Sequence, residues 1–126
     1  MEDKTKKVLI IEDSENILSL LEAMLSSEGF QIETRENIYN IVHHLKQDAP
    51  DLILMDMLLS GANGCDACRD IKMTPELNHI PIVMMSAHPS GELDCGGAGA
   101  DYFVSKPFEM EELLDIIKKS VSIDTV

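Results

Sequence analysis

Short apolar runs, each of strand length, recur along the chain and stop at a polar or charged residue. Val8–Ile11, Leu52–Met55 and Ile80–Met85 are the clearest of these runs. Such runs are typical of strands that are buried on both faces of a parallel sheet. Weaker runs at Phe30–Thr34 and Tyr102–Val104 complete a predicted set of five strands.

Amphipathic stretches separate the apolar runs and predict helices. Ser14 is a candidate N-cap of the first helix, which Gly29 ends, and Asn37 is a candidate N-cap of the second. A third helix is predicted from about Cys65 to Met73, and a last one from near Glu109. The apolar stripes at helical spacing are Ile17, Leu18, Leu21, Met24 and Leu25; Ile38, Ile41, Val42 and Leu45; and Met110, Leu113, Leu114 and Ile117.

The stretch 88–99 differs from the other helical segments because it holds four glycines and Pro89. Glycine costs about 1 kcal/mol relative to alanine in a helix, so a fourth helix here is expected to be short or mobile. Strands that alternate with helices imply parallel pairing through right-handed crossovers. The predicted fold is α/β, a doubly wound five-stranded parallel sheet flanked by five helices. No linker or repeat is visible, so residues 1–126 are expected to form a single domain.

Polar side chains stand at the strand ends, where doubly wound sheets form their sites. Glu12 and Asp13 follow the first strand, Asp56 the third, Ser86 the fourth and Lys106 the fifth. Carboxylates brought together repel one another unless a cation neutralises them, and oxygen ligands of this kind favour Mg²⁺, Mn²⁺ or Ca²⁺ over zinc. A nucleophilic Asp with a metal, a Lys and a hydroxyl suits phosphoryl transfer.

Each of these residues also has a structural explanation when it is taken alone. Glu12 and Asp13 could form a solvated turn or a helix cap, and Asp56 could be another loop acid. Ser86 could be structural, and Lys106 could be a surface residue before a turn. The functional interpretation is favoured because the residues occur together, each at the end of its own strand.

The formal net charge of −13 and the pI near 4.5 restrict the partners of the chain. A surface this acidic repels nucleic acid and anionic membranes, and it suits a divalent cation or a basic partner. The N-terminal residues are polar, and no apolar run approaches the roughly 18 residues of a spanning helix. We therefore expect a cytoplasmic protein with no membrane contact and no direct binding of nucleic acid.

The three cysteines, Cys65, Cys68 and Cys95, are a poor match to a disulfide framework because their number is odd. Cys65 and Cys68 form a CxxC pattern, which could indicate redox or zinc chemistry. The pair lies within a predicted helix, however, and buried free thiols are the simpler interpretation.

The sequence resembles the response-regulator receiver domain family over about residues 6–121. The segments that carry the resemblance are Val8–Asp13, Asp51–Asp56, Pro81–Ala87 and Gly99–Phe108. The resemblance implies a flavodoxin-like fold of the receiver type. It also implies a cis bond between Lys106 and Pro107, which tertiary contacts would have to hold.

The resemblance implies a role for each strand-end residue. Asp56 would be the phosphoacceptor, and Lys106 would grip the phosphoryl group. Mg²⁺ or Mn²⁺ would be held by Glu12, Asp13, Asp56 and the backbone carbonyl of Leu58. Ser86 would be the switch hydroxyl and Phe103 the switch aromatic.

The function implied is that of a phosphoacceptor in two-component signalling. A sensor histidine kinase or a histidine phosphotransfer protein would donate the phosphoryl group, and a changed face would bind a downstream protein target. The chain would assist its own phosphorylation and dephosphorylation without turning over an external substrate, as a monomer or a weak homodimer.

Three alternatives remain beside this function. The first is a receiver-like binding module that is independent of phosphorylation. The second is a flavodoxin-like FMN-binding protein, although Glu12 and Asp13 would repel the phosphate of that cofactor. The third is a phosphatase with an Asp nucleophile, although such enzymes commonly carry a second Asp two residues on, where this chain has Leu58.

Two positions depart from the pattern of the receiver family. Ser60 stands where the family usually has proline, and we expect it to loosen the loop after Asp56. Leu58 has no polar side chain to orient a hydrolytic water. We therefore predict slow loss of the phosphoryl group.

Overall fold

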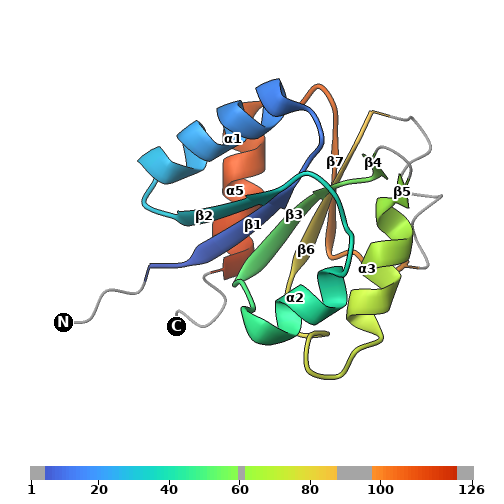
Figure 1. Cartoon of the computed structure of the whole chain (residues 1–126). Coiled ribbons are helices and arrows are strands. Elements are labelled where there is room, and N and C mark those ends of the chain that lie inside the picture. The colour runs from blue at the N-terminus through green and yellow to red at the C-terminus, as the bar shows by residue number, and fades with distance from the viewer. Residues whose placement is uncertain (1–4, 60–61, 88–97, 122–126) are drawn as a thin grey trace.

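The apolar runs form the centre of a five-stranded parallel sheet in the computed structural model of the chain (Figure 1). The structure describes residues 5–59, 62–87 and 98–121. The strands of this sheet are β1 (Lys7–Ile11), β2 (Gln31–Arg35), β3 (Leu52–Asp56), β6 (Ile82–Ser86) and β7 (Tyr102–Ser105). Their order, β2-β1-β3-β6-β7, confirms the doubly wound topology.

The register of the strands brings their carboxyl ends to one edge of the sheet. Ile11 pairs with Met55 in β3, and Asp56 pairs with Met85 in β6. Ser86, the next residue, pairs with Ser105 in β7. The residues that follow β1, β3, β6 and β7 therefore start from neighbouring positions.

Four helices in the described part of the chain cover the two faces of the sheet (Figure 1). On one face lie α1 (Glu15–Ser27) and α5 (Met110–Val121), and on the other lie α2 (Ile41–Gln47) and α3 (Gly64–Lys72). Alternate residues of the central strands point to opposite faces, so each face has its own apolar cluster. The α1/α5 face buries Val8, Ile10, Leu52, Leu54, Val83 and Met85, and the α2/α3 face buries Leu9, Ile11, Ile53, Met55, Ile82 and Met84.

The caps of the helices show where local prediction succeeded and where it failed. Ser14 caps α1, as predicted, because its side chain accepts a hydrogen bond from the Ile17 amide. The predicted cap at Asn37 is wrong, and α2 begins only at Ile41. Asn37 instead accepts from the Tyr39 amide in a local turn, at 3.0 Å.

The segment after β3 is more ordered than the loop that was expected there. Leu58–Leu59 (β4) and Ala62–Asn63 (β5) form a short antiparallel pair. Asn63 then caps α3 by accepting a hydrogen bond from the Cys65 amide at 2.7 Å. The expected fourth helix and Ser60 lie outside the described residues.

The prediction of free thiols is confirmed for Cys68, which is buried and free, and is wrong for Cys65, which is disulfide-bonded. The position of the CxxC pattern within a predicted helix carries no information about a bond to another part of the chain. Burial raises the pKa of the Cys68 thiol to about 11, so this thiol is chemically quiet at neutral pH. Within the described segments, the helices are all too short or too polar to cross a bilayer.

Candidate functional site

Three carboxylates converge at the carboxyl edge of the sheet, as the strand-end pattern predicted. Glu12 and Asp13 follow β1 directly, and Asp56 is the last residue of β3. One oxygen of each lies within 4.8 Å of the others. Glu12 and Asp56 are only 1% and 6% exposed, so bulk water screens little of their mutual repulsion.

Lys106 contacts two of these carboxylates. Its Nζ lies 3.1 Å from Glu12 Oε1 and 3.2 Å from Asp56 Oδ1. The Lys106 amide donates to the Ser86 carbonyl at 2.8 Å, which ties the segment after β7 to the end of β6. The bond between Lys106 and Pro107 is cis, as the resemblance implied.

Glu12 links the lysine to the start of α1. While Oε1 accepts from Lys106, Oε2 accepts from the Ser14 amide at 3.1 Å. Glu12 was predicted as a metal ligand, and this double contact was not predicted. No sequence pattern indicates it, because it depends on the distance between the ends of β1 and β7.

The electrostatics of the cluster leave an excess of negative charge. Burial raises the pKa of Asp56 above its ordinary value of 3.8, and the Glu12 charge raises it further, against the opposing effect of Lys106. Burial by itself lowers the pKa of Lys106, but the hydrogen bond to Glu12 and the Asp56 charge outweigh it, and the net pKa is raised. Lys106 is therefore a permanent cation that offsets only part of the cluster, and the carboxylate donor set fits a divalent metal ion.

Gly64 allows the segment after Asp56 to fold back on the site. Its amide donates to the Met57 carbonyl at 2.6 Å, and a Cβ at this position would lie 2.4 Å from the Asp56 carbonyl oxygen. Only glycine fits so close an approach of two backbone segments. This requirement for glycine was not predicted, although the Asn63-Gly64 pair is a sequence signal for a turn.

The predicted switch residues lie on the neighbouring strands. Ser86 is the last residue of β6 and is 5% exposed. Phe103 pairs with Met84 in the sheet and packs, partly buried, against the α2/α3 cluster. Leu58, the predicted carbonyl ligand, lies in β4, and its side chain is 56% exposed.

Comparison with known proteins gives a consistent family. The model of the response regulator receiver domain matches residues 8–118. The phosphate regulon transcriptional regulatory protein PhoB of Rhizobium meliloti is 33% identical over 114 residues, which are 89% of this chain and 50% of that protein. This chain thus spans about half the length of that relative.

Solved structures agree with this match. The receiver domain of a signal transduction histidine kinase from Syntrophus aciditrophicus is 30% identical with a TM-score of 0.88, over 97% of this chain and 95% of that one. The receiver domain of a sensor histidine kinase from Pseudomonas aeruginosa, solved with a magnesium ion in its active-site cleft, is 28% identical with a TM-score of 0.85, over 94% and 98%. The chain belongs to the response-regulator receiver domain family, the phosphoacceptor modules of two-component signal transduction.

Proposed function

We propose that Asp56 is the phosphoacceptor of this receiver and that Mg²⁺ is its metal. The observation that carries the proposal is the buried Asp56 carboxylate, which lies within 4.8 Å of two other carboxylates and 3.2 Å from Lys106 Nζ. Glu12, Asp13 and Asp56 would hold the ion, together with the backbone carbonyl of Leu58. When bound, Mg²⁺ supplies positive charge that offsets the carboxylates and the incoming phosphoryl oxygens.

The reaction is a transfer between two covalent carriers. An Asp56 carboxylate oxygen attacks the phosphorus of a phosphohistidine, a P–O bond forms, and the P–N bond to the imidazole breaks. The imidazole leaves with the electron pair of that bond and takes a proton from solvent. The raised Lys106 pKa keeps its ammonium charged throughout, so it can exchange one carboxylate contact for a phosphoryl oxygen.

Ser86 and Phe103 would convert this local event into a change of shape. Ser86 is one residue beyond the register partner of Asp56, and this position supports a role in which its hydroxyl would bind a phosphoryl oxygen. Phe103, on β7, would change position when Ser86 binds the phosphoryl group. This would alter the shape of a face that binds a downstream protein. The donor would be a sensor histidine kinase or a histidine phosphotransfer protein.

The direct test is incubation with Mg²⁺ and acetyl phosphate, followed by intact mass measurement. We expect a gain of about 80 Da in the wild type, none in Asp56→Asn, and a normal gain in Asp115→Asn. Asp115 is an exposed acid on α5 and serves as the matched control. A wild-type protein that never gains mass would favour the phosphorylation-independent binding module instead.

A further inference from the structure

The CxxC pattern in α3 is a motif that the proposed phosphoacceptor chemistry does not use. Its two cysteines are in different chemical states, since Cys65 is disulfide-bonded and Cys68 is buried and free. The bond of Cys65 therefore joins α3 to a cysteine outside the pair. The sequence offers Cys95 for this bond, and Cys95 lies outside the described residues.

Cys65 lies in the first turn of α3, next to the glycine that contacts the backbone of the phosphoacceptor. The Gly64 amide donates to the Met57 carbonyl at 2.6 Å, and a Cβ on Gly64 would lie 2.4 Å from the Asp56 carbonyl oxygen. The Cys65 amide in turn donates to the side chain of Asn63 at 2.7 Å. A covalent bond at Cys65 thus restrains the helical turn against which the backbone of Asp56 packs.

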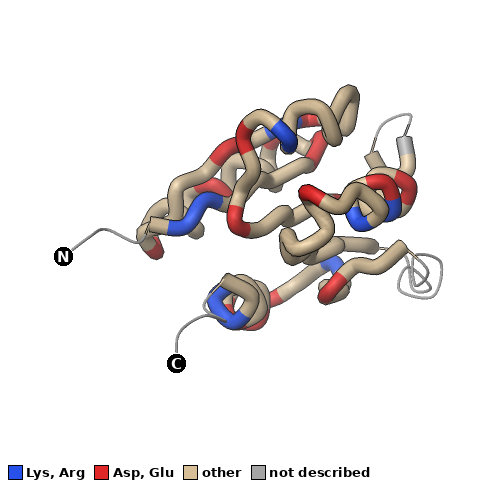
Figure 2. The backbone as a smooth tube through the Cα atoms, turned by 90° about the horizontal axis from the view of Figure 1, so that it is seen from below, with Lys and Arg blue, Asp and Glu red and all other residues tan. Residues whose placement is uncertain are grey.

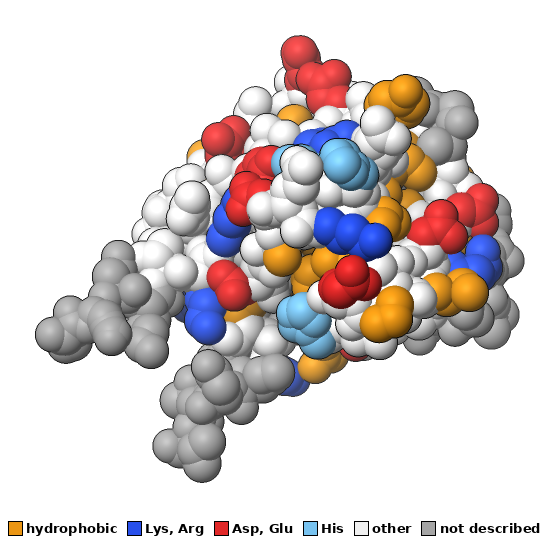
Figure 3. Space-filling model, turned by 60° about the horizontal axis from the view of Figure 1, so that its bottom comes forward, with side chains coloured by type: hydrophobic (Ala, Val, Ile, Leu, Met, Phe, Trp, Pro, Cys, Tyr) orange, Lys and Arg blue, Asp and Glu red, His pale blue; other side chains and the backbone are white. Residues whose placement is uncertain are grey.

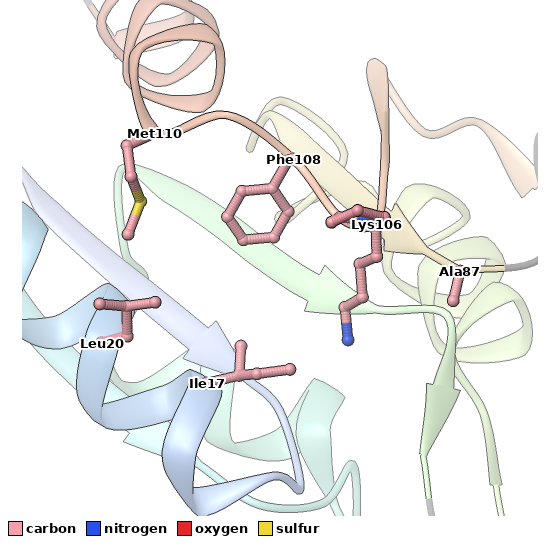
Figure 4. A pocket seen from close by; sticks show the side chains of 7 residues that line it. Ile17, Leu20, Ala87, Lys106, Phe108 and Met110 are labelled. Atoms are coloured by element: carbon pink, nitrogen blue, oxygen red, sulfur yellow. The ribbon is translucent and has the colours of Figure 1, made fainter.

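The Asp56 carboxylate is held between this turn and Lys106. Lys106 extends from the segment that joins β7 to α5, and its Nζ lies 3.2 Å from Asp56 Oδ1 (Figure 4). A shift of the α3 turn would move the carboxylate relative to Lys106 and to the other carboxylates of the cluster. A misplacement of about 1 Å can slow a reaction by about 100-fold, so a small shift is enough to change the rate.

The rest of α3 is held independently of the disulfide. The Cys68 thiol donates to the Ala98 carbonyl at 3.6 Å, in a contact within the core. Near the end of the helix, Lys72 Nζ lies 2.9 Å from Asp101 Oδ2. Opening the bond of Cys65 is therefore expected to loosen the first turn of α3 and to leave the remainder of the helix in place.

The two cysteines of the pattern differ in reactivity as well as in bonding. A helix N-terminus stabilises a thiolate, so the Cys65 sulfur is a good leaving group when a thiol attacks its disulfide. Burial raises the pKa of the Cys68 thiol to about 11, so Cys68 stays protonated at neutral pH and is a poor nucleophile toward the neighbouring bond. An external thiol is therefore needed to open the bond.

Charge and surface character indicate which thiols can act. Asp and Glu recur along the whole described chain and outnumber Lys and Arg, so anionic thiols are repelled (Figure 2). Among the described residues of the face shown in Figure 3, apolar side chains are interspersed with charges of both signs, which gives a protein reductant no broad apolar patch to bind there. Cys65 is only 4% exposed. A small uncharged dithiol fits these conditions.

We propose that the disulfide of Cys65 is a redox switch that sets how fast Asp56 accepts a phosphoryl group, with the bonded form as the faster one. This role rests on the proposed function. A dithiol opens the bond by giving up two electrons and two protons: the Sγ–Sγ bond breaks, two cysteine thiols form, and the dithiol closes to its own disulfide. An oxidised dithiol reverses the reaction.

The test measures phosphorylation by acetyl phosphate and Mg²⁺ in oxidised, dithiothreitol-reduced and reoxidised protein, by intact mass over time. Alkylation in denaturant counts the free thiols of each sample, and two more should be alkylated after reduction than before. Cys65→Ser and Cys95→Ser each remove the bond, whereas Cys68→Ala keeps it and is the matched control. Circular dichroism verifies that each variant folds, and the reduced wild type tests the same change without any substitution.

We expect reduction to slow phosphorylation of the wild type by between about threefold and about 100-fold, and reoxidation to restore the rate. Cys65→Ser and Cys95→Ser should be slow with or without dithiothreitol, and Cys68→Ala should respond as the wild type does. Equal rates in oxidised and reduced wild type would overturn the redox switch alone, and so would a Cys65 that is alkylated without prior reduction. A wild type that accepts no phosphoryl group in either state would refute the proposed function and the switch with it.

Discussion

Replacing Asp56 with Asn should make the metal-free protein more stable, although Asp56 is the residue on which the proposed chemistry depends. The wild-type fold holds three carboxylates within 4.8 Å of one another, and Lys106 pairs with two of them, Glu12 and Asp56. The Asn side chain has nearly the same shape, and its Oδ1 can still accept a hydrogen bond from Lys106. The substitution therefore removes a charge and little else.

The magnitude follows from the distances. At an effective dielectric constant of about 20, two charges at the 4.8 Å limit of the cluster repel by about 3.5 kcal/mol, so at that limit Glu12 and Asp13 together oppose the Asp56 charge by about 7 kcal/mol. The attraction between Lys106 Nζ and Asp56 Oδ1, which are 3.2 Å apart, offsets about 5 kcal/mol of this repulsion. The ionised Asp56 side chain therefore destabilises the fold by about 2 kcal/mol. Its removal predicts a melting temperature about 6 to 10 °C higher in the variant.

The pH dependence has a definite sign. Because the pKa of Asp56 is raised in the fold above its ordinary value of 3.8, its carboxyl group stabilises the folded state only while it is protonated. That contribution is complete below the ordinary pKa and is lost as pH rises through the folded pKa. The gain in the free energy of unfolding from Asp56→Asn should therefore be complete at neutral pH. It should vanish in acid, where the wild-type carboxyl group is uncharged.

The assay is urea unfolding of wild type and variant with EDTA and then with Mg²⁺, repeated across acidic and neutral pH. Asp115→Asn removes one exposed charge elsewhere and measures the general effect of lowering the net charge. Mg²⁺ should stabilise the wild type more than Asp56→Asn, because binding to the folded state adds stability in proportion to affinity. An Asn variant that is less stable than the wild type in EDTA at neutral pH would refute the reasoning.

The other predictions concern single positions. Gly64→Ala should lower the free energy of unfolding by about 1 to 3 kcal/mol, measured by urea unfolding, because its Cβ would lie 2.4 Å from the Asp56 carbonyl oxygen. Leu58→Asn should speed loss of the phosphoryl group in a mass time course, because Leu58 offers no polar group to orient water; rapid decay that is unchanged by the substitution would contradict this. Cys68 should react with thiol reagents only after unfolding, since it is buried with a pKa near 11. Leu113→Ala should cost about 2 to 5 kcal/mol, because Leu113 is 0% exposed in the α1/α5 cluster.

The fold could be predicted from the sequence because its main signal is local. Val8–Ile11 and Leu52–Met55 are buried along their whole length, as continuous apolar runs require. The start of α2 was not predictable in the same way, because Asn37 can cap a helix or close a turn with similar local contacts. At such positions the choice depends on how the apolar residues that follow, Ile38 and Ile41, pack in the core.

The site was predictable as a set of residues but not as a network. Alignment of the strand ends indicates that Glu12, Asp56 and Lys106 meet. Whether Lys106 pairs with one carboxylate or two depends on side-chain reach across the ends of β1, β3 and β7, which the sequence does not encode as a pattern. The close approach at Gly64 is equally non-local, because the atom that excludes a Cβ belongs to Asp56 in the preceding strand.

The same carboxylates lower the stability of the metal-free fold and favour the binding of a metal ion. Each carboxylate that the fold brings into the cluster repels the others and destabilises the metal-free fold, and the same negative potential is what attracts a divalent cation. More positive charge at the position of Lys106 would weaken this attraction. A cluster whose carboxylates were fully neutralised by the protein would have no affinity left for the metal. The excess negative charge around Asp56 is therefore a requirement of the site, and the buried strands of the core supply the stability that the site gives up.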